Sequence, residues 1–215
     1  YKFIRLNMIA ILPLRKNSKR LKNKNIKKIN GKPLFEFILK NLINSKLISK
    51  IVVTTDYKLK INHPKINILK RPKKLCGNCN MNMVIDHVIN NFEDKNYIQV
   101  HATSPLVKSK TIDKAIKFYL QNKNYDSLFS VTKIKKRFWN SKNKPYNHKL
   151  SAAPTTQTLK ELFEENSGFY IFNKNIFKKK LNRIGYKPKL FEISKLEGFD
   201  IDDNQDFEIV EKLLS

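Results

Sequence analysis

The sequence predicts an α/β protein of three layers, in which helices cover both faces of a mostly parallel central sheet. Two observations support this fold class. Short apolar runs, typical of strands buried on both faces, recur along the chain. Segments with apolar residues at helical spacing separate these runs, which is the alternation that βαβ units produce. Ligands of such sheets bind at the carboxyl ends of the strands, so the loops that follow strands are expected to carry function.

The first half of the sequence contains three predicted strands and two predicted helices. The first strand is Met8–Leu14, which is almost entirely apolar, and a polar basic loop follows it. Pro33 then stands at the expected first position of a helix. Further strands are predicted at 51–54 and 66–69, and a second helix at 83–92.

The same patterns continue in the second half, with one interruption. At 133–153, Lys, Asn, Ser and Pro replace the apolar periodicity and aromatic residues are embedded among them, so we expect a small irregular excursion or a hairpin. The remaining predicted strands are 97–101, 127–132, 169–172 and 189–193, and the remaining helices are 111–120, 174–181 and 204–214.

Length and composition predict one globular domain. With 215 residues, 40% of them hydrophobic and 29% charged, the chain can bury a sizeable core. We expect the domain to span 8–215 and residues 1–7 to be an upstream extension, because Met8 stands directly before the first strand. No apolar run reaches the roughly 18 residues of a membrane helix, and 1–7 lacks the features of a secretory signal, so a cytoplasmic protein is expected.

The net charge of +26 has two explanations. A basic surface is typical of proteins that bind nucleic acid or anionic membranes. Lysine, however, far outnumbers arginine and is spread along the chain with abundant Asn and Ile, which an A+T-rich coding sequence produces whatever the function. We therefore expect neither nucleic acid nor a membrane as partner. The two cysteines, Cys76 and Cys79, are too few for a four-ligand zinc site, and we expect reduced thiols in a loop.

The most informative loop spans residues 14–25. It places several cations around Ser18 directly after the first strand, in the order L-R-K-N-S-K-R-L-K-N-K-N. A polyanion such as a triphosphate would find backbone donors and positive charge there. The glycines of a Walker A loop or a dinucleotide-binding fingerprint are absent. The residues alone therefore predict an anion-binding loop.

A pair of carboxylates stands near the end of the sequence. Asp200 and Asp202 are separated by one residue, so on an extended segment both side chains point the same way and can share a hard cation such as Mg²⁺. The alternative is an acidic start to the last helix, favoured by the helix dipole, to which Asp203 and Asp206 would also contribute.

Six motifs in order resemble those of the acylneuraminate cytidylyltransferases, a family of CMP-sugar synthetases. They cover nearly the whole chain: the loop above with G-K-P-L at 31–34, V-V-T-T-D at 52–56, R-P-K-K-L at 71–75, A-T-S-P-L at 102–106, S-G-F-Y at 167–170 and D-I-D at 200–202. The resemblance implies a Rossmann-like fold of the nucleotide-diphospho-sugar transferase type. It also implies transfer of CMP from CTP to an acidic sugar, with release of pyrophosphate and Mg²⁺ as cofactor.

The resemblance also implies roles for individual residues. The catalytic cations would be Arg15, Lys19 and Lys24, and the metal ligands Asp200 and Asp202. The sugar would be bound by His101, Thr103 and Ser104, although Ser and Pro in this segment also fit a helix start capped by Ser109. Asp56 is open to two roles, general base or support of the loop. The nucleotide-binding residues would be Leu14, Arg15, Ser18, Asn25, Arg71 and Asn78.

The T-S-P-L segment resembles the acylneuraminate branch rather than the octulosonate branch, so we expect a sialic-acid-like, nonulosonic acceptor. Three positions depart from the usual family pattern: His101, Val107 and Asn78. Val107 replaces an Arg and removes a bidentate partner for a carboxylate. The sugar then differs from sialic acid itself, or another cation holds its carboxylate; the candidates are Arg137, Lys142 and Lys144.

Two rival functions remain, and the oligomeric state is a separate expectation. One rival is a nucleotidyltransferase of the same fold with another nucleotide or acceptor. The other is a basic nucleic-acid-binding protein with degenerate motifs. The resemblance, together with the aromatic residues around Trp139, leads us to expect a homodimer.

Overall fold

The computed structural model describes residues 8–16, 18, 20–77, 79–150 and 155–214. Seven strands form one sheet in the order β5-β4-β1-β6-β8-β7-β9. Only β8 runs antiparallel to its neighbours β6 and β7, so the sheet is mostly parallel, as predicted. The strands are β1 Met8–Leu14, β4 Ile48–Thr55, β5 Ile66–Lys70, β6 Asn96–Val100, β7 Ser127–Ile134, β8 Leu162–Asn173 and β9 Pro188–Glu192.

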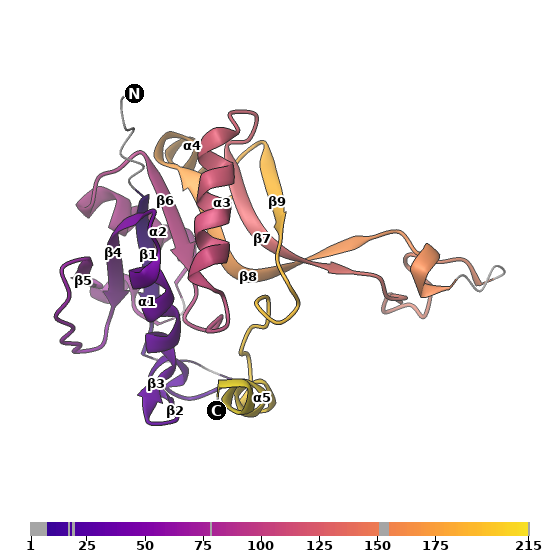
Figure 1. Cartoon of the computed structure of the whole chain (residues 1–215), viewed down its shortest axis with the longest axis horizontal. Helices are drawn as coiled ribbons and strands as arrows, with labels where there is room; N and C mark the ends of the chain where they lie inside the picture. The colour runs from indigo at the N-terminus through magenta and orange to yellow at the C-terminus, as the bar shows by residue number, and fades with distance from the viewer. Residues whose placement is uncertain (1–7, 17, 19, 78, 151–154, 215) are drawn as a thin grey trace.

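Helices cover both faces of this sheet, which gives the three predicted layers (Figure 1). Helices α1 (Leu34–Asn44) and α3 (Ser109–Gln121) share one hydrophobic cluster with the sheet. Helices α2 (Met81–Asn91) and α4 (Lys174–Lys180) share the cluster on the opposite face. The buried strands are apolar on both sides because both sides are covered.

The last helix, α5 (Asn204–Leu214), lies beyond the carboxyl edge of the sheet (Figure 1). It packs in a third cluster with Leu21 and Ile29, near the short hairpin of β2 (Lys28–Ile29) and β3 (Lys32–Pro33). The basic loop after β1 and the chain before α5 are thereby brought to the same edge. The short 3-10 turns η1 (Lys24–Ile26) and η2 (Lys73–Leu75) also belong to loops that follow strands.

Most predicted boundaries lie within a few residues of the observed ones, and β1 and α5 have the predicted bounds. Two details of helix starts were wrong. Pro33 is the N-cap residue of α1 and not its first residue, and the N-cap of α3 is Lys108 rather than Ser109. Strand β8 begins at Leu162, well before the predicted Phe169.

The interruption predicted near 133–153 is a hairpin arm. Strands β7 and β8 remain paired as far as Ile134 and Leu162, and the chain between them projects away from the sheet (Figure 1). Trp139 and Pro145 form a bridge within the arm, and η4 (Thr156–Thr158) lies on its return path. Residues 151–154 lie outside the described part of the chain.

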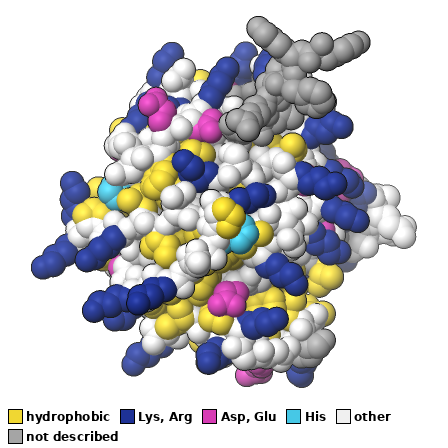
Figure 2. Space-filling model, turned by 60° about the vertical axis from the view of Figure 1, so that its left-hand side comes forward, with side chains coloured by type: hydrophobic (Ala, Val, Ile, Leu, Met, Phe, Trp, Pro, Cys, Tyr) yellow, Lys and Arg dark blue, Asp and Glu magenta, His cyan; other side chains and the backbone are white. Residues whose placement is uncertain are grey.

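Among the described helices, none combines the length and the apolarity that crossing a membrane requires. Figure 2 shows that on one face of the molecule the Lys and Arg side chains are scattered among hydrophobic and uncharged ones rather than gathered into one stripe. The face in this view therefore lacks the single basic stripe of a nucleic-acid footprint.

Candidate active site

A cavity of about 300 Å³ lies at the carboxyl edge of the sheet, between the loop after β1 and the segment before α5. It is where a ligand of a doubly covered sheet is expected. Nine of the residues predicted from sequence line it: Arg15, Ser18, Lys24, Asn25, Arg71, His101, Thr103, Asp200 and Asp202. Its wall also includes Pro13, Arg20, Met81, Ala102 and Ser167.

The loop after β1 is held in place by hydrogen bonds to its backbone. Asn25 is buried and donates from Nδ2 to the carbonyl oxygen of Arg15 at 3.0 Å. The backbone amide of Lys16 donates to Oδ1 of Asp56 at 2.7 Å, and the Tyr57 hydroxyl donates to the Lys16 carbonyl. The carboxylate of Asp56 therefore supports the loop, which is one of the two roles left open for it.

Lys24 reaches from this loop to the segment that carries the two carboxylates. Its Nζ donates to the carbonyl oxygen of Ile201 and lies 3.7 Å from Oδ1 of Asp202. The side chain is only 12% exposed. Burial lowers the pKa of Lys24, and the attraction of Asp200 and Asp202 offsets this only in part. A desolvated ammonium in a cavity is a strong binding group for phosphate oxygens.

Arg71 supplies a second buried cation to the cavity wall. It is 5% exposed, and its Nε and Nη2 have no hydrogen-bond partner among the described residues. Burial lowers its pKa, with Asp56 acting in the opposite direction. Unpaired buried donors cost about 1–3 kcal/mol each, more on a charged group, so the arrangement is one that a ligand with acceptor atoms would complete.

The carboxylates of Asp200 and Asp202 have different environments. Burial raises the pKa of Asp200 to about 6, against the hydrogen bond from Thr103, and its Oδ1 has no described partner. Asp202 is 42% exposed and pairs with Arg20 at 2.6 Å between Nη2 and Oδ1. The backbone amide of Asp202 donates to Asp206, so Asp206 serves the start of α5 instead.

These carboxylates fit a divalent cation that also contacts a substrate. Among the described residues, no cluster of three or more His, Cys, Asp or Glu could enclose a metal ion. Mg²⁺, however, is usually held by one or two carboxylates together with substrate phosphates rather than by a complete protein cage. Asp200, whose buried Oδ1 has no described partner, lines the same cavity as Arg15, Lys24 and Arg71, which is consistent with that arrangement.

The predicted sugar-binding residues divide into two groups. His101 and Thr103 line the cavity, whereas Ser104 is 1% exposed and its hydroxyl is buried away from it. Burial, together with Arg183 and Lys24, lowers the pKa of His101 to about 3, so the imidazole is neutral. The Thr103 carbonyl accepts from the amide of Ile201, which ties the acidic segment to the end of β6.

Three predicted nucleotide-binding or catalytic residues remain, and the structure describes one of them. The side chain of Leu14 is fully buried in the core, so only its backbone could contact a nucleotide. Lys19 and Asn78 lie outside the described residues. Sequence reasoning assigned no role to Ser167, which lies within S-G-F-Y and has a φ of 58°, a left-handed conformation that costs energy for a residue other than Gly.

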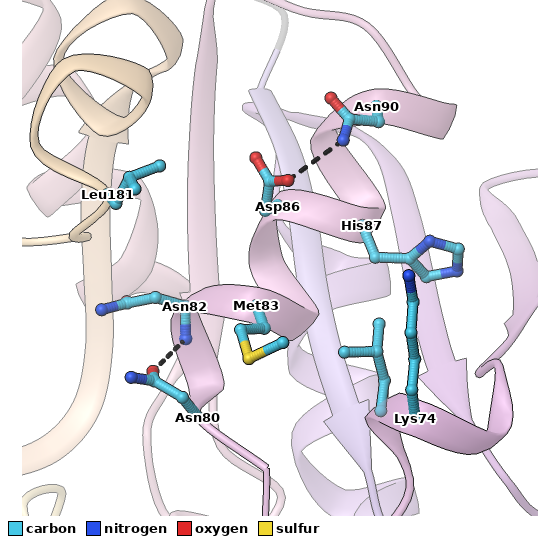
Figure 3. A pocket seen from close by; sticks show the side chains of 9 residues that line it. Lys74, Asn80, Asn82, Met83, Asp86, His87, Asn90 and Leu181 are labelled. Carbon is cyan, nitrogen blue, oxygen red and sulfur yellow. Dashed lines mark hydrogen bonds between the residues drawn. The ribbon is translucent and has the colours of Figure 1, made fainter.

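A larger cavity of about 660 Å³ adjoins the first, sharing Ser167, Asp200 and Asp202 with it. It lies at the root of the arm, where Lys136 and Lys195 contribute to its wall. A separate cavity of about 430 Å³ lies along α2 (Figure 3). Its side chains include neither the predicted site residues nor the carboxylate pair, so we do not assign it to the active site.

Comparison with known proteins identifies the family. Residues 9–214 match the family described as cytidylyltransferase. The chain belongs to this family. It is therefore a nucleotidyltransferase, and the enzyme class predicted from sequence is confirmed.

Two curated relatives resemble this cytidylyltransferase over most of its length. It is 27% identical to post-translational flagellin modification protein B of Campylobacter coli, covering 96% of this chain and 94% of the relative. It is 26% identical to the N-acylneuraminate cytidylyltransferase of Escherichia coli, covering 96% of this chain. This chain spans about half the length of the Escherichia coli relative, with 52% covered. The resemblance to CMP-sugar synthetases is confirmed.

A solved structure shares the fold of this cytidylyltransferase. A CMP:2-keto-3-deoxy-manno-octonic acid synthetase complexed with CTP superimposes with a TM-score of 0.69, covering 97% of this chain and 98% of that one. Sequence identity between them is 14%, so the likeness concerns the fold alone. The Rossmann-like fold class predicted from sequence is thereby confirmed.

Proposed function

We propose that this cytidylyltransferase transfers CMP from CTP to a nonulosonic acid, a sialic-acid-like 2-keto acid sugar, and releases pyrophosphate. The observation that carries the proposal is the cavity in which the cations of the first loop, buried Arg71 and the carboxylates of Asp200 and Asp202 meet. The N-acylneuraminate cytidylyltransferase of Escherichia coli supports the choice of acceptor class.

The nucleotide is proposed to lie along the loop after β1. Lys24 and Arg15 bind its phosphates, with Ser18 shaping the loop beside them. The base lies toward Arg71, which lines the cavity and whose buried Nε and Nη2 have no partner among the described residues. Asn25 holds the Arg15 carbonyl in position and contributes at the ribose.

The acceptor binds beside His101 and Thr103, with its anomeric hydroxyl in line with the α-phosphorus. As the anomeric oxygen bonds to the α-phosphorus, its proton passes to water, the bond from phosphorus to the pyrophosphate oxygen breaks and negative charge develops on the leaving group. Lys24 and Arg15 stabilise this charge. Positioning of the two substrates supplies much of the remaining acceleration.

Asp200 and Asp202 would hold Mg²⁺ together with the phosphates. When bound, the ion supplies positive charge that neutralises the phosphate oxygens during transfer. The proposal is supported by the unpartnered oxygen of Asp200 and by its place in the same cavity as the loop cations.

The test is pyrophosphate release with CTP and a panel of sialic, legionaminic, pseudaminic and octulosonic acids. We expect turnover with at least one nine-carbon acid, and its loss in Lys24→Ala and Asp202→Ala. The exposed neighbour Lys22→Ala is the matched control and should retain activity. Silence of the folded wild-type protein with every acid would overturn the acceptor assignment.

The same assay separates the rival functions. Replacing CTP by ATP, GTP or UTP tests whether another nucleotide is preferred by this fold. A nucleic-acid-binding protein would release no pyrophosphate and would bind RNA or DNA with a steep dependence on salt concentration.

We also propose that the enzyme is a cytoplasmic homodimer. The arm between β7 and β8 carries the exposed side chains of Trp139 and Tyr146, which are 53% and 71% exposed. Large apolar side chains of this kind are common in protein interfaces, and a second copy of the chain could cover them. Sedimentation of the wild type and of Trp139→Ser tests this; a monomeric wild type would contradict it.

A further inference from the structure

Arg183 lies in the turn between α4 and β9, close to the active site but outside every motif described above. Hydrogen bonds from the two residues after Arg183 hold the backbone of this turn in place. The Ile184 amide donates to Oδ1 of Asn182 at 2.9 Å, and the Gly185 amide donates to Oγ of Ser127 at 2.8 Å. A Cβ on Gly185 would stand 2.2 Å from Asp126, so the backbone here packs closely against the start of β7. The backbone next to Arg183 is therefore held in place.

The groups in direct contact with the guanidinium of Arg183 are neutral. Its Nη1 donates to Oε1 of Gln99 at 2.5 Å and lies 3.4 Å from Nε2 of His101. Its Cζ lies 3.5 Å from the centre of the Tyr170 ring, a stacked cation–π contact. Since arginine only donates hydrogen bonds, it favours a His101 whose Nε2 is unprotonated.

This cation has no anionic partner in direct contact. No described carboxylate lies within ion-pair distance of it; the nearby Glu165 accepts instead from the Tyr170 hydroxyl. Burial lowers the pKa of Arg183, with Tyr170 and Glu165 acting in the opposite direction, so the cost of desolvating its charge is offset only in part. Taking an ion out of water costs several kcal/mol unless an opposite charge compensates. The arrangement is therefore one that an incoming anion would stabilise.

Position 107, where the family commonly has an Arg, does not supply a cation to the cavity. Val107 is fully buried in the core cluster with α1 and α3, and its carbonyl accepts from Asn41. The cations considered from sequence, Arg137, Lys142 and Lys144, belong to the arm. Arg183, by contrast, contacts His101, which lines the cavity where the acceptor is proposed to bind.

We propose that Arg183 is the residue that recognises the carboxylate of the acidic sugar. The inference rests on the proposed function, because it names a specificity residue for that acceptor. A carboxylate beside His101 would pair with the planar fork of the guanidinium, while Tyr170 and Gln99 hold the fork in orientation. The acceptor would then be chosen by its charge as well as by its shape.

The test combines a variant with a change in the substrate. Arg183→Gln is compared with the wild type for each acid of the panel that supports turnover and for the methyl ester of that acid. Charge-assisted hydrogen bonds contribute enough that the acceptor KM of Arg183→Gln should rise by about 10- to 100-fold. The KM for CTP should change less than about threefold, because the phosphates bind elsewhere. Lys179→Gln, an exposed cation on α4, is the matched control.

The ester distinguishes recognition from a merely structural role. The acceptor KM of the ester with the wild type should be as high as that of the acid with Arg183→Gln. With Arg183→Gln, the KM values of acid and ester should differ less than about threefold. The inference would be overturned if esterification weakened the acceptor as much in Arg183→Gln as in the wild type, or if the acceptor KM of Arg183→Gln were unchanged. Either result would leave the proposed function intact. If Arg183→Gln does not fold, the acid-to-ester ratio of Arg183→Lys decides. A wild type inactive with every acid refutes the proposed function instead.

Discussion

Replacing Lys24 by Met should abolish most of the activity without unfolding the protein. Met keeps the length and apolar character of the lysine stem but removes the charge that contacts Ile201 and Asp202. Lys22→Met is the matched control, because Lys22 lies two residues away in the same loop and is exposed.

The expected stability change follows from two opposing contributions. At 3.7 Å from Asp202 and an effective dielectric constant of about 20, the attraction is about 4.5 kcal/mol before desolvation. The lowered pKa of Lys24 means that the desolvation cost exceeds the attraction, so the folded state disfavours the ammonium relative to water. Removing the charge relieves the desolvation cost but also loses the hydrogen bond to the carbonyl oxygen of Ile201. The free energy of unfolding should therefore change by less than about 1.5 kcal/mol.

The catalytic effect should be much larger. Loss of one preorganised group that stabilises developing charge typically lowers kcat by about 10²- to 10³-fold, or about 3–4 kcal/mol in the activation free energy. Urea unfolding and pyrophosphate release measure the two quantities on the same preparations. If Lys24→Met instead lost several kcal/mol of stability, with activity falling only in proportion to the unfolded fraction, Lys24 would be a structural residue and the reasoning would be refuted.

Three further predictions concern the same region. The raised pKa of Asp200 means that the folded state favours its protonated form, so its contribution to stability is present at low pH and lost as pH rises through about 6. In urea unfolding, Asp200→Asn should therefore be stabilising at pH 7 and close to neutral at pH 4.5. The opposite trend would contradict the burial argument. Arg20→Ala removes a largely exposed ion pair, so the free energy of unfolding should change by less than about 1 kcal/mol. The Mg²⁺ concentration that gives half-maximal activity should fall by up to about fivefold, because Asp202 keeps Lys24 but loses Arg20 as a competing partner; an unchanged or higher Mg²⁺ requirement argues against this competition. Gly198→Ala would place Cβ 2.4 Å from Oγ1 of Thr132 and 2.6 Å from Nδ2 of Asn166. The free energy of unfolding, measured by heat or urea, should fall by about 1–3 kcal/mol, and adding Thr132→Ala should recover part of it. A fully stable Gly198→Ala variant would show that the neighbouring side chains move freely.

The cavity residues that could be predicted from sequence lie in short motifs that follow strands. Arg15, Lys24 and the carboxylates of Asp200 and Asp202 are of this kind, because their chemistry and spacing are visible within a few positions. The loop after β1 and the D-I-D segment were far apart in sequence, but the parallel sheet brings both to one edge. The fold class was predictable for the same reason, since buried parallel strands are apolar throughout.

The remaining features depend on three-dimensional packing. The first four residues of β8, L-F-E-E, are too polar to resemble a core strand. They lie at the base of the arm, where no helix covers them. Leu14 was assigned to the nucleotide by its place in the motif, but its side chain faces the core. Arg183 has no local signal in the sequence, since the role proposed for it follows from contacts with Gln99 and Tyr170 on other strands.

The position of α5 has a consequence for the order in which the enzyme becomes competent as it is synthesised. The seven strands are complete at Glu192, yet the wall of the cavity also requires Asp200 and Asp202, and the chain that carries them is anchored by the packing of α5 on Leu21 and Ile29. A nascent chain can form its sheet before this helix has emerged, but the loop after β1 and the carboxylates of Asp200 and Asp202 cannot yet face each other. The wall of the cavity is therefore complete only once α5 has docked on Leu21 and Ile29.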